Sequence, residues 1–384
     1  MLLRDTALID HEHRRLATAM SVLLRDGRVD WIRPADDEGP VPADAEVVDA
    51  SGTTTLPAMV DAHCHVTLPG GAHWLGHVTD PPERLRAIAE DNARLLRQAG
   101  VRWIRDVGSP VADGRAISLD VRDAWAGRDG YPYIRAAGAW VARTGSCPGG
   151  VEVEDGDGLL AAATEQLDAG ADLVKLYLDG PDRASAPFTV NEVRQVVELA
   201  HGRGLRVTAH SGYLAGARVG AEAGVDAIEH GFQLDADVAA LMAAGGTALV
   251  STLAVLESWV TFGATTNQER FTSTAGRQRI TERREVARAS VLLAHRAGVV
   301  VAAGTDAGGG SLRANQLAWE VEALVAAGLD PYDAVLAVTV NGGHVLGEPE
   351  VGLIREGGPA DLVLVHGDPL SDPAALWRVW RTTW

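Results

Sequence analysis

Lys175 is the single lysine among the 34 lysine and arginine residues of this 384-residue chain. It lies in the apolar run from Leu173 to Leu178, which follows a glycine and is typical of a buried strand. An unpaired ammonium group would be costly there, but a lysine amine, unlike an arginine guanidinium, can lose its proton and react. We infer that this position requires the chemistry of an amine.

Histidine residues supply a second kind of chemistry. His63 and His65 stand two positions apart in an expected strand, so both imidazoles point to one face and can grip a divalent metal ion. His210, His230 and Asp306 each close a later apolar segment that begins with a glycine. A lone buried histidine is usually a core residue with a satisfied hydrogen bond, whereas this group at matching strand ends indicates a metal centre.

The elements that must position these residues repeat along the chain as a helical stretch, a glycine at the helix end and a short apolar strand. We expect strands at 55–66, 100–106, 133–141, 170–178, 204–210, 224–230, 246–251 and 298–306. Strands that alternate with helices in this way predict an α/β fold, a (β/α)8 TIM barrel. A doubly wound open sheet would alternate similarly, but only a barrel gathers polar residues from every strand end on one face.

The two ends of the chain lack the barrel period. Residues 19–31, 47–52 and 361–366 are typical of short strands separated by turns. We assign residues 1–55 and 351–384 to one small β-sandwich module formed by both termini, and residues 56–350 to the barrel.

Composition narrows the class of protein. The chain has 46% hydrophobic residues, two cysteines and a formal net charge of -18 at pH 7. Two cysteines exclude a disulfide framework, the first residues lack the apolar core of a signal peptide, and no apolar run reaches membrane-spanning length. The negative charge disfavours nucleic acid and anionic lipid. We expect a cytoplasmic protein with a small-molecule substrate and no nucleic-acid or membrane partner, and we leave a homo-oligomer open.

The expected neighbours of Lys175, which are imidazoles and a carboxylate, suggest that this lysine takes part in metal binding. A neutral amine can add carbon dioxide to form a carbamate, an anion whose two oxygens can bridge two metal ions. We expect two divalent ions bridged by the Lys175 carbamate, with His63, His65 and Asp306 as ligands of one and His210 and His230 as ligands of the other. Nitrogen and carboxylate ligands suit zinc best, and manganese, cobalt and nickel are alternatives.

Several segments resemble the signatures of a known family. Residues 56–65, Leu-Pro-Ala-Met-Val-Asp-Ala-His-Cys-His, look like its first-strand signature, and 228–231, 304–308, 341–347 and 360–364 are similarly placed. In these motifs the chain resembles the amidohydrolase superfamily, in its binuclear branch with a carboxylated lysine. Within it the chain is most similar to the imidazolonepropionase-like and Xaa-Pro-dipeptidase-like group.

The resemblance implies a mechanism as well as a fold. A hydroxide that bridges two metal ions is a good nucleophile near neutral pH, because metal binding lowers the pKa of water. Asp306 would take the proton of the hydroxide and pass it to the departing nitrogen, unless it serves only as a ligand. The expected activity is hydrolysis of an amide C–N bond in a small molecule such as an N-acyl amino acid, a dipeptide or a cyclic amide.

Other enzyme classes are compatible with these ligands. A mononuclear deaminase or imidazolone-type ring hydrolase would not need Lys175, and such deaminases commonly carry a glutamate where Tyr213 stands here. Hydrolysis of a lactone or a phosphotriester would use the same metals, because their carbonyl or phosphoryl oxygen is polarised in the same way. A non-catalytic scaffold is disfavoured, since all six expected ligand positions are filled.

The loops after the strands should select the substrate. Arg143 follows the third strand and is a candidate clamp for a substrate carboxylate, although an ordinary surface arginine is an equally simple interpretation. Tyr177 and Tyr213 are candidates to donate hydrogen bonds to a bound carbonyl or carboxylate group. The segment 253–276, which is rich in aromatic residues, is either a lid or a cover for the barrel rim.

Overall fold

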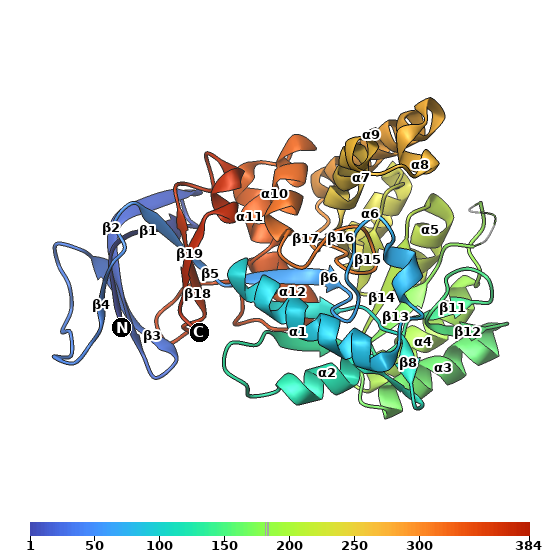
Figure 1. The fold of residues 1–384 in the computed structure, drawn as a ribbon, viewed down its shortest axis with the longest axis horizontal. Coiled ribbons are helices and arrows are strands. Elements are labelled where there is room, and N and C mark those ends of the chain that lie inside the picture. The colour runs from blue at the N-terminus through green and yellow to red at the C-terminus, as the bar shows by residue number, and fades with distance from the viewer. Residues whose placement is uncertain (181, 183) are drawn as a thin grey trace.

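The computed structural model describes residues 1–180, 182 and 184–384. A sheet made from both ends of the chain lies beside a larger body of parallel strands surrounded by helices (Figure 1). The parallel strands and their helices confirm the predicted α/β fold of the barrel type. In the described part of the chain, no helix is both long enough and apolar enough to cross a membrane.

The sheet at the chain ends has the strand order β19-β18-β5-β1-β2-β3, and β4 pairs with β1. Its strands are β1 (Leu2–Asp10), β2 (Arg15–Arg25), β3 (Arg28–Pro34), β4 (Val47–Asp49), β5 (Thr53–Pro57), β18 (Leu362–His366) and β19 (Val379–Thr382). Leu362 and Leu364 of β18 share one apolar cluster with Leu3, Leu8 and Leu24, so residues from both ends of the chain build the same core. Both termini accordingly lie on this side of the molecule (Figure 1).

The larger body holds the strands that were expected to form a barrel. They are β6 (Met59–Cys64), β7 (Val101–Asp106), β10 (Tyr133–Ala136), β13 (Leu173–Tyr177), β14 (Arg206–Ser211), β15 (Ala227–His230), β16 (Ala248–Ser251) and β17 (Val301–Ala303). Neighbouring strands run parallel, in the orders β10-β7-β6 and β13-β14-β15-β16-β17. Their interior is filled by small side chains, among them Val60, Ala62, Ala227, Ala248 and Ala302.

The ladder of paired strands is interrupted at two places, and backbone hydrogen bonds cross both. After β17, Asp306 N donates to His63 O at 2.8 Å, and His65 N donates to Ala307 O at 2.8 Å. On the other side, Asp172 N donates to Ala136 O at 2.8 Å. The two bonds after β17 bring the first and last strands together, which places His63 beside Asp306. The bond of Asp172 brings β10 next to β13.

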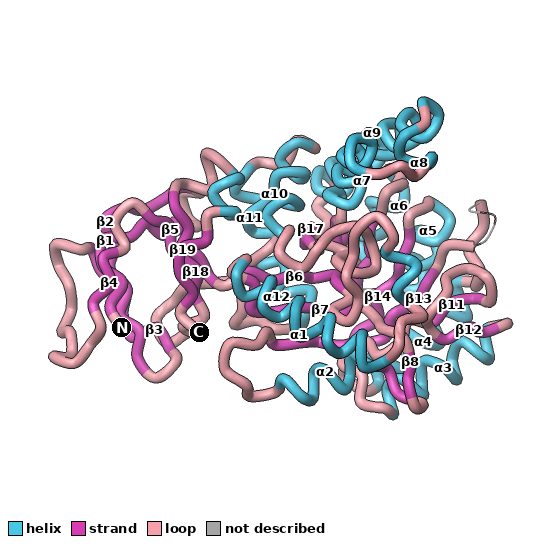
Figure 2. Tube along the Cα trace, in the orientation of Figure 1, coloured by secondary structure: helices cyan, strands magenta, loops and turns pink. Residues whose placement is uncertain are grey.

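Helices form the outer layer around these strands (Figure 2). They are α1 (Pro82–Gln98), α2 (Ile117–Trp125), α3 (Gly156–Asp168), α4 (Val190–Gly202), α5 (Leu214–Ala223), α6 (Ala236–Gly245), α7 (Leu253–Thr265), α8 (Glu269–Thr272), α9 (Thr274–Arg296), α10 (Leu317–Ala326), α11 (Pro331–Ala337) and α12 (Val340–Leu346). In α4, a capping box of Thr189 and Glu192 starts the helix, and Val193, Val196 and Ala200 recur at helical spacing to bury one face.

Two expected strands are divided in the structure. The segment 55–66 splits at Ala58: β5 pairs with β18 in the terminal sheet, whereas β6 pairs with β7. The segment 133–141 splits into β10 and β11 (Val141–Arg143), because Gly138 adopts a φ of 75° and turns the chain. Beyond β11, β12 (Val151–Val153) extends the sheet, and β8 (Val111–Ala112) and β9 (Arg115–Ala116) form a short hairpin.

Candidate active site

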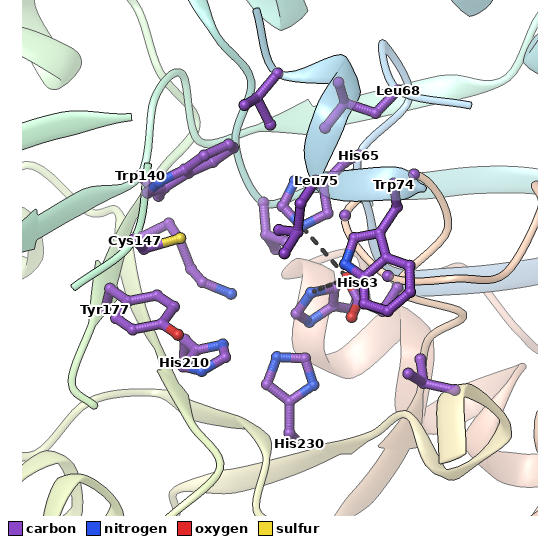
Figure 3. A pocket seen from close by; sticks show the side chains of 18 of the residues that line it. His63, His65, Leu68, Trp74, Leu75, Trp140, Cys147, Tyr177, His210 and His230 are labelled. Atoms are coloured by element: carbon purple, nitrogen blue, oxygen red, sulfur yellow. Dashed lines mark ion pairs between the residues drawn. The ribbon is translucent and has the colours of Figure 1, made fainter. Parts of the chain in front are cut away.

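The six expected metal ligands come together at the carboxyl ends of the parallel strands. His63 and His65 lie at the end of β6, and Lys175 lies near the end of β13. They line one cavity of about 330 Å³ together with His210, His230 and Asp306. Figure 3 shows the four imidazoles turned toward a common space, although they belong to three strands.

The atoms around Asp306 have the spacing of ligands of a single metal ion. Asp306 Oδ1 lies 3.4 Å from His63 Nε2 and 3.5 Å from His65 Nε2. Two donors bound about 2.1 Å from zinc at a tetrahedral angle are about 3.4 Å apart. His63, His230 and Asp306 each offer a ligand atom within 4.8 Å of the others. The donor set therefore fits a divalent metal ion.

Hydrogen bonds fix the ring orientation of the two histidines on β6. His63 Nδ1 lies 2.5 Å from Glu229 Oε2, and His65 Nδ1 lies 2.7 Å from the carbonyl oxygen of Gly108. Since both partners accept a hydrogen bond, each Nδ1 is the nitrogen that donates to its partner. This leaves both Nε2 atoms, which face Asp306, available to bind a metal ion.

The other two histidines are held in the same manner from the opposite side of the cavity. His210 Nε2 donates to Asp179 Oδ2 at 3.1 Å, which leaves Nδ1 as its free nitrogen. His230 Nδ1 and Thr252 Oγ1 share a hydrogen bond of 2.7 Å, which leaves Nε2. Metal-binding histidines usually have such a partner on the second nitrogen, because it fixes the tautomer and the ring direction.

Glu229 is a buried carboxylate at the centre of this support. Arg105 Nη2 lies 2.5 Å from Glu229 Oε1, and Thr208 Oγ1 donates to the same oxygen. Burial by itself would raise the pKa of Glu229, but the charge of Arg105 and the hydrogen bond from His63 hold it well below its usual range. Glu229 is therefore ionised and keeps the proton of His63 on Nδ1. Its place next to His230 in the Ile-Glu-His-Gly segment was the signal in the sequence.

The environment of Lys175 favours the neutral amine. The side chain is 3% exposed, and burial lowers the pKa of Lys175 from its usual 10.5 to about 8, although the charge of Glu229 opposes the change. About a tenth of such an amine is unprotonated at pH 7, which suffices for reaction with an electrophile. Asp306 has the opposite character, because burial would raise its pKa but the neighbouring histidines hold it well below its usual range.

Two of the six residues have a strained backbone. His230 adopts a φ of 70° and Asp306 a φ of 51°, values that residues other than glycine rarely take. Such conformations persist where the surrounding structure imposes them, and they are frequent at functional sites. Here the strain turns both side chains toward the cavity at the points where β15 and β17 end.

Glycines permit the close approach of the loop after β17 to the histidines of β6. A Cβ atom on Gly304 would lie 2.4 Å from His63 Cβ, and one on Gly309 would lie 2.2 Å from His65 Cδ2. No side chain fits at either place without moving the backbone. The glycine-rich segment that follows Ala303 is thus explained by packing against the metal-ligand candidates.

The rest of the cavity wall is mainly apolar and aromatic. Figure 3 shows the rings of Trp140 and Trp74 on opposite sides of the space above the histidines. Trp259 of α7 stacks on Trp74, with ring centroids 5.7 Å apart, and packs with Phe271 of α8. Of the segment 253–276, Val255 and Trp259 line the cavity, and most of the segment is helical, in α7, α8 and the start of α9.

The structure places the three expected substrate residues differently. Tyr177 lines the cavity and stacks on His210, with ring centroids 3.9 Å apart. Arg143 is exposed, and its Nη1 donates to the carbonyl oxygen of Pro187 at 2.9 Å. Tyr213 precedes α5 at its N-cap. Among the described residues that line the cavity, neither Arg143 nor Tyr213 is present.

Arg283 and Phe232 line the cavity but were missed by reasoning from the sequence. Arg283 is one of many arginines on α9, and nothing in their spacing distinguishes it from the others. Phe232, two residues after His230, reads as an ordinary core residue. Asp106, at the end of β7, accepts backbone hydrogen bonds from Val66 at 2.8 Å and Gly108 at 3.0 Å, so it anchors the neighbouring loops.

Comparisons with known proteins show which family this chain resembles. The amidohydrolase family matches residues 54–382. An uncharacterized protein of Mycobacterium tuberculosis is 36% identical over 366 residues, which are 94% of this chain and 89% of the relative. An ochratoxinase of Aspergillus niger is 30% identical over 232 residues, which are 56% of this chain and 46% of the relative.

A solved structure of a Xaa-Pro dipeptidase with bound methionine has the same fold, with a TM-score of 0.84. It is 24% identical in sequence, and the match covers 99% of this chain and 97% of that one. The named relatives and neighbours are hydrolases. The chain belongs to the amidohydrolase family, whose members are hydrolases with a divalent metal centre.

Proposed function

We propose that this protein hydrolyses an amide C–N bond of a small molecule at a centre of two divalent metal ions. The proposal depends most on one observation: four histidines, each with its second nitrogen held by a fixed partner, share a cavity with Asp306 and a buried lysine. This arrangement matches what metal ligands need and what core histidines do not.

The residues would divide into two groups of ligands. His63, His65 and Asp306 would hold one ion, and His210 and His230 the other, with Lys175 as a carbamate between them. Zinc suits these donors best, with manganese, cobalt or nickel as substitutes. When bound, the ions would lower the pKa of a water molecule and polarise the substrate carbonyl.

Asp306 would move the proton during the reaction. Water supplies a hydroxyl group to the acyl carbon, the C–N bond breaks, and the nitrogen leaves with a proton. Asp306 is ionised and its Oδ1 lies near His63 Nε2 and His65 Nε2, so its carboxylate would accept the proton that the water molecule loses and deliver it to the departing nitrogen. The apolar walls exclude bulk water from these steps.

The substrate would be an N-acyl amino acid, a dipeptide or a cyclic amide. A cavity of about 330 Å³ accommodates a molecule of that size. The names of the Xaa-Pro dipeptidase and the ochratoxinase among the similar proteins both refer to small substrates, which supports a small substrate here.

Metal content tests the centre directly. We expect about two metal ions per chain in protein purified without chelator, and a sharp fall in Lys175→Arg and Lys175→Ala. After metal removal, restoration of both ions should require bicarbonate, because the carbamate must form again. Added acetate should partly restore Lys175→Ala and not Lys175→Arg, since the arginine fills the space that a carboxylate would occupy. Elemental analysis measures each of these results.

Other results would favour the alternative chemistries. One metal ion per chain, unchanged in the lysine variants, would contradict the bridging role and favour a mononuclear deaminase or ring hydrolase. If the protein holds two ions and cleaves lactones or phosphotriesters but no amide, the proposed metal centre stands and the proposed substrate class is wrong.

A further inference from the structure

Arg283 brings a positive charge to the wall of the cavity. It lies on α9. Among the described residues that line this cavity, Lys175 and Arg283 are the only lysine and arginine residues. Lys175 is itself one of the metal-ligand candidates and lines the cavity together with the histidines. Arg283 is therefore the permanent cation that a bound molecule meets away from the metal ligands.

The neighbours of Arg283 on α9 are paired with carboxylates, whereas Arg283 is not. Arg288 Nη2 lies 2.6 Å from Glu257 Oε1, and Arg284 Nη1 lies 3.4 Å from Glu257 Oε2. In the part of the chain that the structure describes, Arg283 forms no ion pair with a carboxylate. The carboxylate of Asp179 lies near Arg283, because both side chains lie close to Gly212. Asp179 forms a hydrogen bond with His210 instead.

Aromatic rings hold the guanidinium group of Arg283 in place. Its Cζ lies 5.2 Å from the ring centroid of Phe232 and 5.7 Å from that of Trp259. Such contacts orient a guanidinium group and leave its N–H donors unused. The indole nitrogen of Trp259 is also buried and has no hydrogen-bond partner among the described residues. This part of the wall thus offers hydrogen-bond donors, and the neighbouring carboxylate of Asp179 is engaged with His210.

Phe232 also sets the separation between Arg283 and the metal-ligand candidates. Its ring centroid lies 5.3 Å from that of His230, and Arg283 Cζ lies 5.2 Å from the same centroid. A small molecule with its amide beside His230 can therefore extend past this single ring and place a second group against Arg283. The guanidinium group of Arg283, which has no carboxylate partner among the described residues, favours an anion at that position.

We propose that Arg283 binds a carboxylate of the substrate, which makes amides of amino acids with a free carboxylate the favoured substrate class. This inference rests on the proposed amide hydrolysis. A guanidinium group offers two parallel N–H donors that match the two oxygens of a carboxylate. The apolar surroundings reduce screening and strengthen the pair. Arg283 takes the role that the sequence suggested for Arg143, and cyclic amides without a carboxylate are disfavoured.

A matched pair of compounds tests this preference in the metal-loaded enzyme. N-acetyl-L-phenylalanine and N-acetyl-L-phenylalaninamide share the same acetyl amide bond and differ in the carboxylate alone. We expect the wild type to prefer the acid in kcat/KM, measured as released acetate. Arg283→Gln should lower kcat/KM for the acid on the order of 10- to 100-fold, mainly through KM, and leave the amide nearly unchanged. Arg283→Lys should keep part of the preference.

Two further variants serve as controls. Arg279→Gln removes the same charge from an exposed position on α9 and should behave as the wild type. Arg143→Gln tests the rival arginine and should keep the preference for the acid. Metal content and melting temperature equal to the wild type in Arg283→Gln would exclude a damaged centre. The proposal is overturned if Arg283→Gln affects both compounds equally or neither, or if Arg143→Gln removes the preference.

Calorimetric binding of the two compounds separates this inference from the proposed function. If neither compound is cleaved, amide hydrolysis fails for this pair, but tighter binding of the acid that is lost in Arg283→Gln still supports the carboxylate site. If the amide is cleaved and the acid is neither preferred nor bound more tightly, the hydrolase proposal stands and the role of Arg283 fails.

Discussion

Each histidine of the site has one nitrogen assigned to a structural partner and one to the cavity. The partners differ chemically: a carboxylate for His63 and His210, a backbone carbonyl for His65, and a hydroxyl group for His230. The hydroxyl of Thr252 is the one partner that can be removed without stranding a buried charge. It therefore gives the cleanest test of what such support contributes.

We expect Thr252→Val to weaken binding of the metal ion on the His210 and His230 side about 10-fold or more. Valine keeps the shape of the side chain but cannot form the hydrogen bond with His230 Nδ1, so the ring loses the partner that fixes its orientation. Competition with a chromogenic chelator would measure the affinity of each ion. Thr247→Val is the matched control, because Thr247 is equally buried and donates to the carbonyl oxygen of Val225, away from the site. Equal losses in both variants would contradict the prediction.

At the scale of elements, the buried carboxylate of Glu320 links α10, β16 and α7. Glu320 on α10 accepts hydrogen bonds from Ser251 Oγ of β16 at 2.6 Å and from the backbone N–H groups of Leu253 and Ala254 at 2.9 and 2.6 Å. Those N–H groups belong to the first turn of α7 and have no partner within the helix. Glu320 thus holds the start of the helix that carries Trp259 over the cavity.

This contact predicts a pH dependence of stability. Burial raises the pKa of Glu320 from its usual 4.5 to about 8, so the folded protein holds a proton that the unfolded chain releases between these values. The free energy of unfolding should therefore fall as pH rises from about 5 to 8. Denaturant unfolding at a series of pH values should show a smaller fall in Glu320→Gln. Glu322→Gln, on the same helix but bonded to Trp377, should keep the wild-type slope. An unchanged slope in Glu320→Gln would disprove the assignment.

At the scale of the whole molecule, residues far apart in sequence close the structure twice. The loop after β17 reaches β6 and places Asp306 beside His63, and β18 joins the strands of the first residues in one sheet. The apolar cluster of Leu364 with Leu3, Leu8 and Leu24 makes the two chain ends depend on each other.

Leu364→Ala should therefore destabilise the protein by about 2–5 kcal/mol, because it removes a fully buried side chain and leaves a cavity between the two ends of the chain. Leu241→Ala is the control, since Leu241 is 38% exposed and should contribute little. The midpoint of denaturant unfolding measures both. Similar midpoints for the two variants would show that the terminal sheet does not depend on this shared core.

The sequence by itself determined the kinds of element and the kinds of chemistry. Apolar strands that start at glycines, and the polar residues His210, His230 and Asp306 at their ends, are local patterns, because strand alternation fixes where a side chain points. The motifs that resemble those of amidohydrolases are also local in sequence, so they predicted the family, and this prediction is confirmed.

Only the tertiary structure decided which supporting and wall residues meet these strand ends. Arg143 stands near the expected face but turns to the carbonyl of Pro187, while Arg283, on a helix full of arginines, lines the cavity. Glu229 meets His63 across 166 positions of sequence. The direction of a long side chain depends on the packing of elements distant in sequence, and no local pattern encodes that packing.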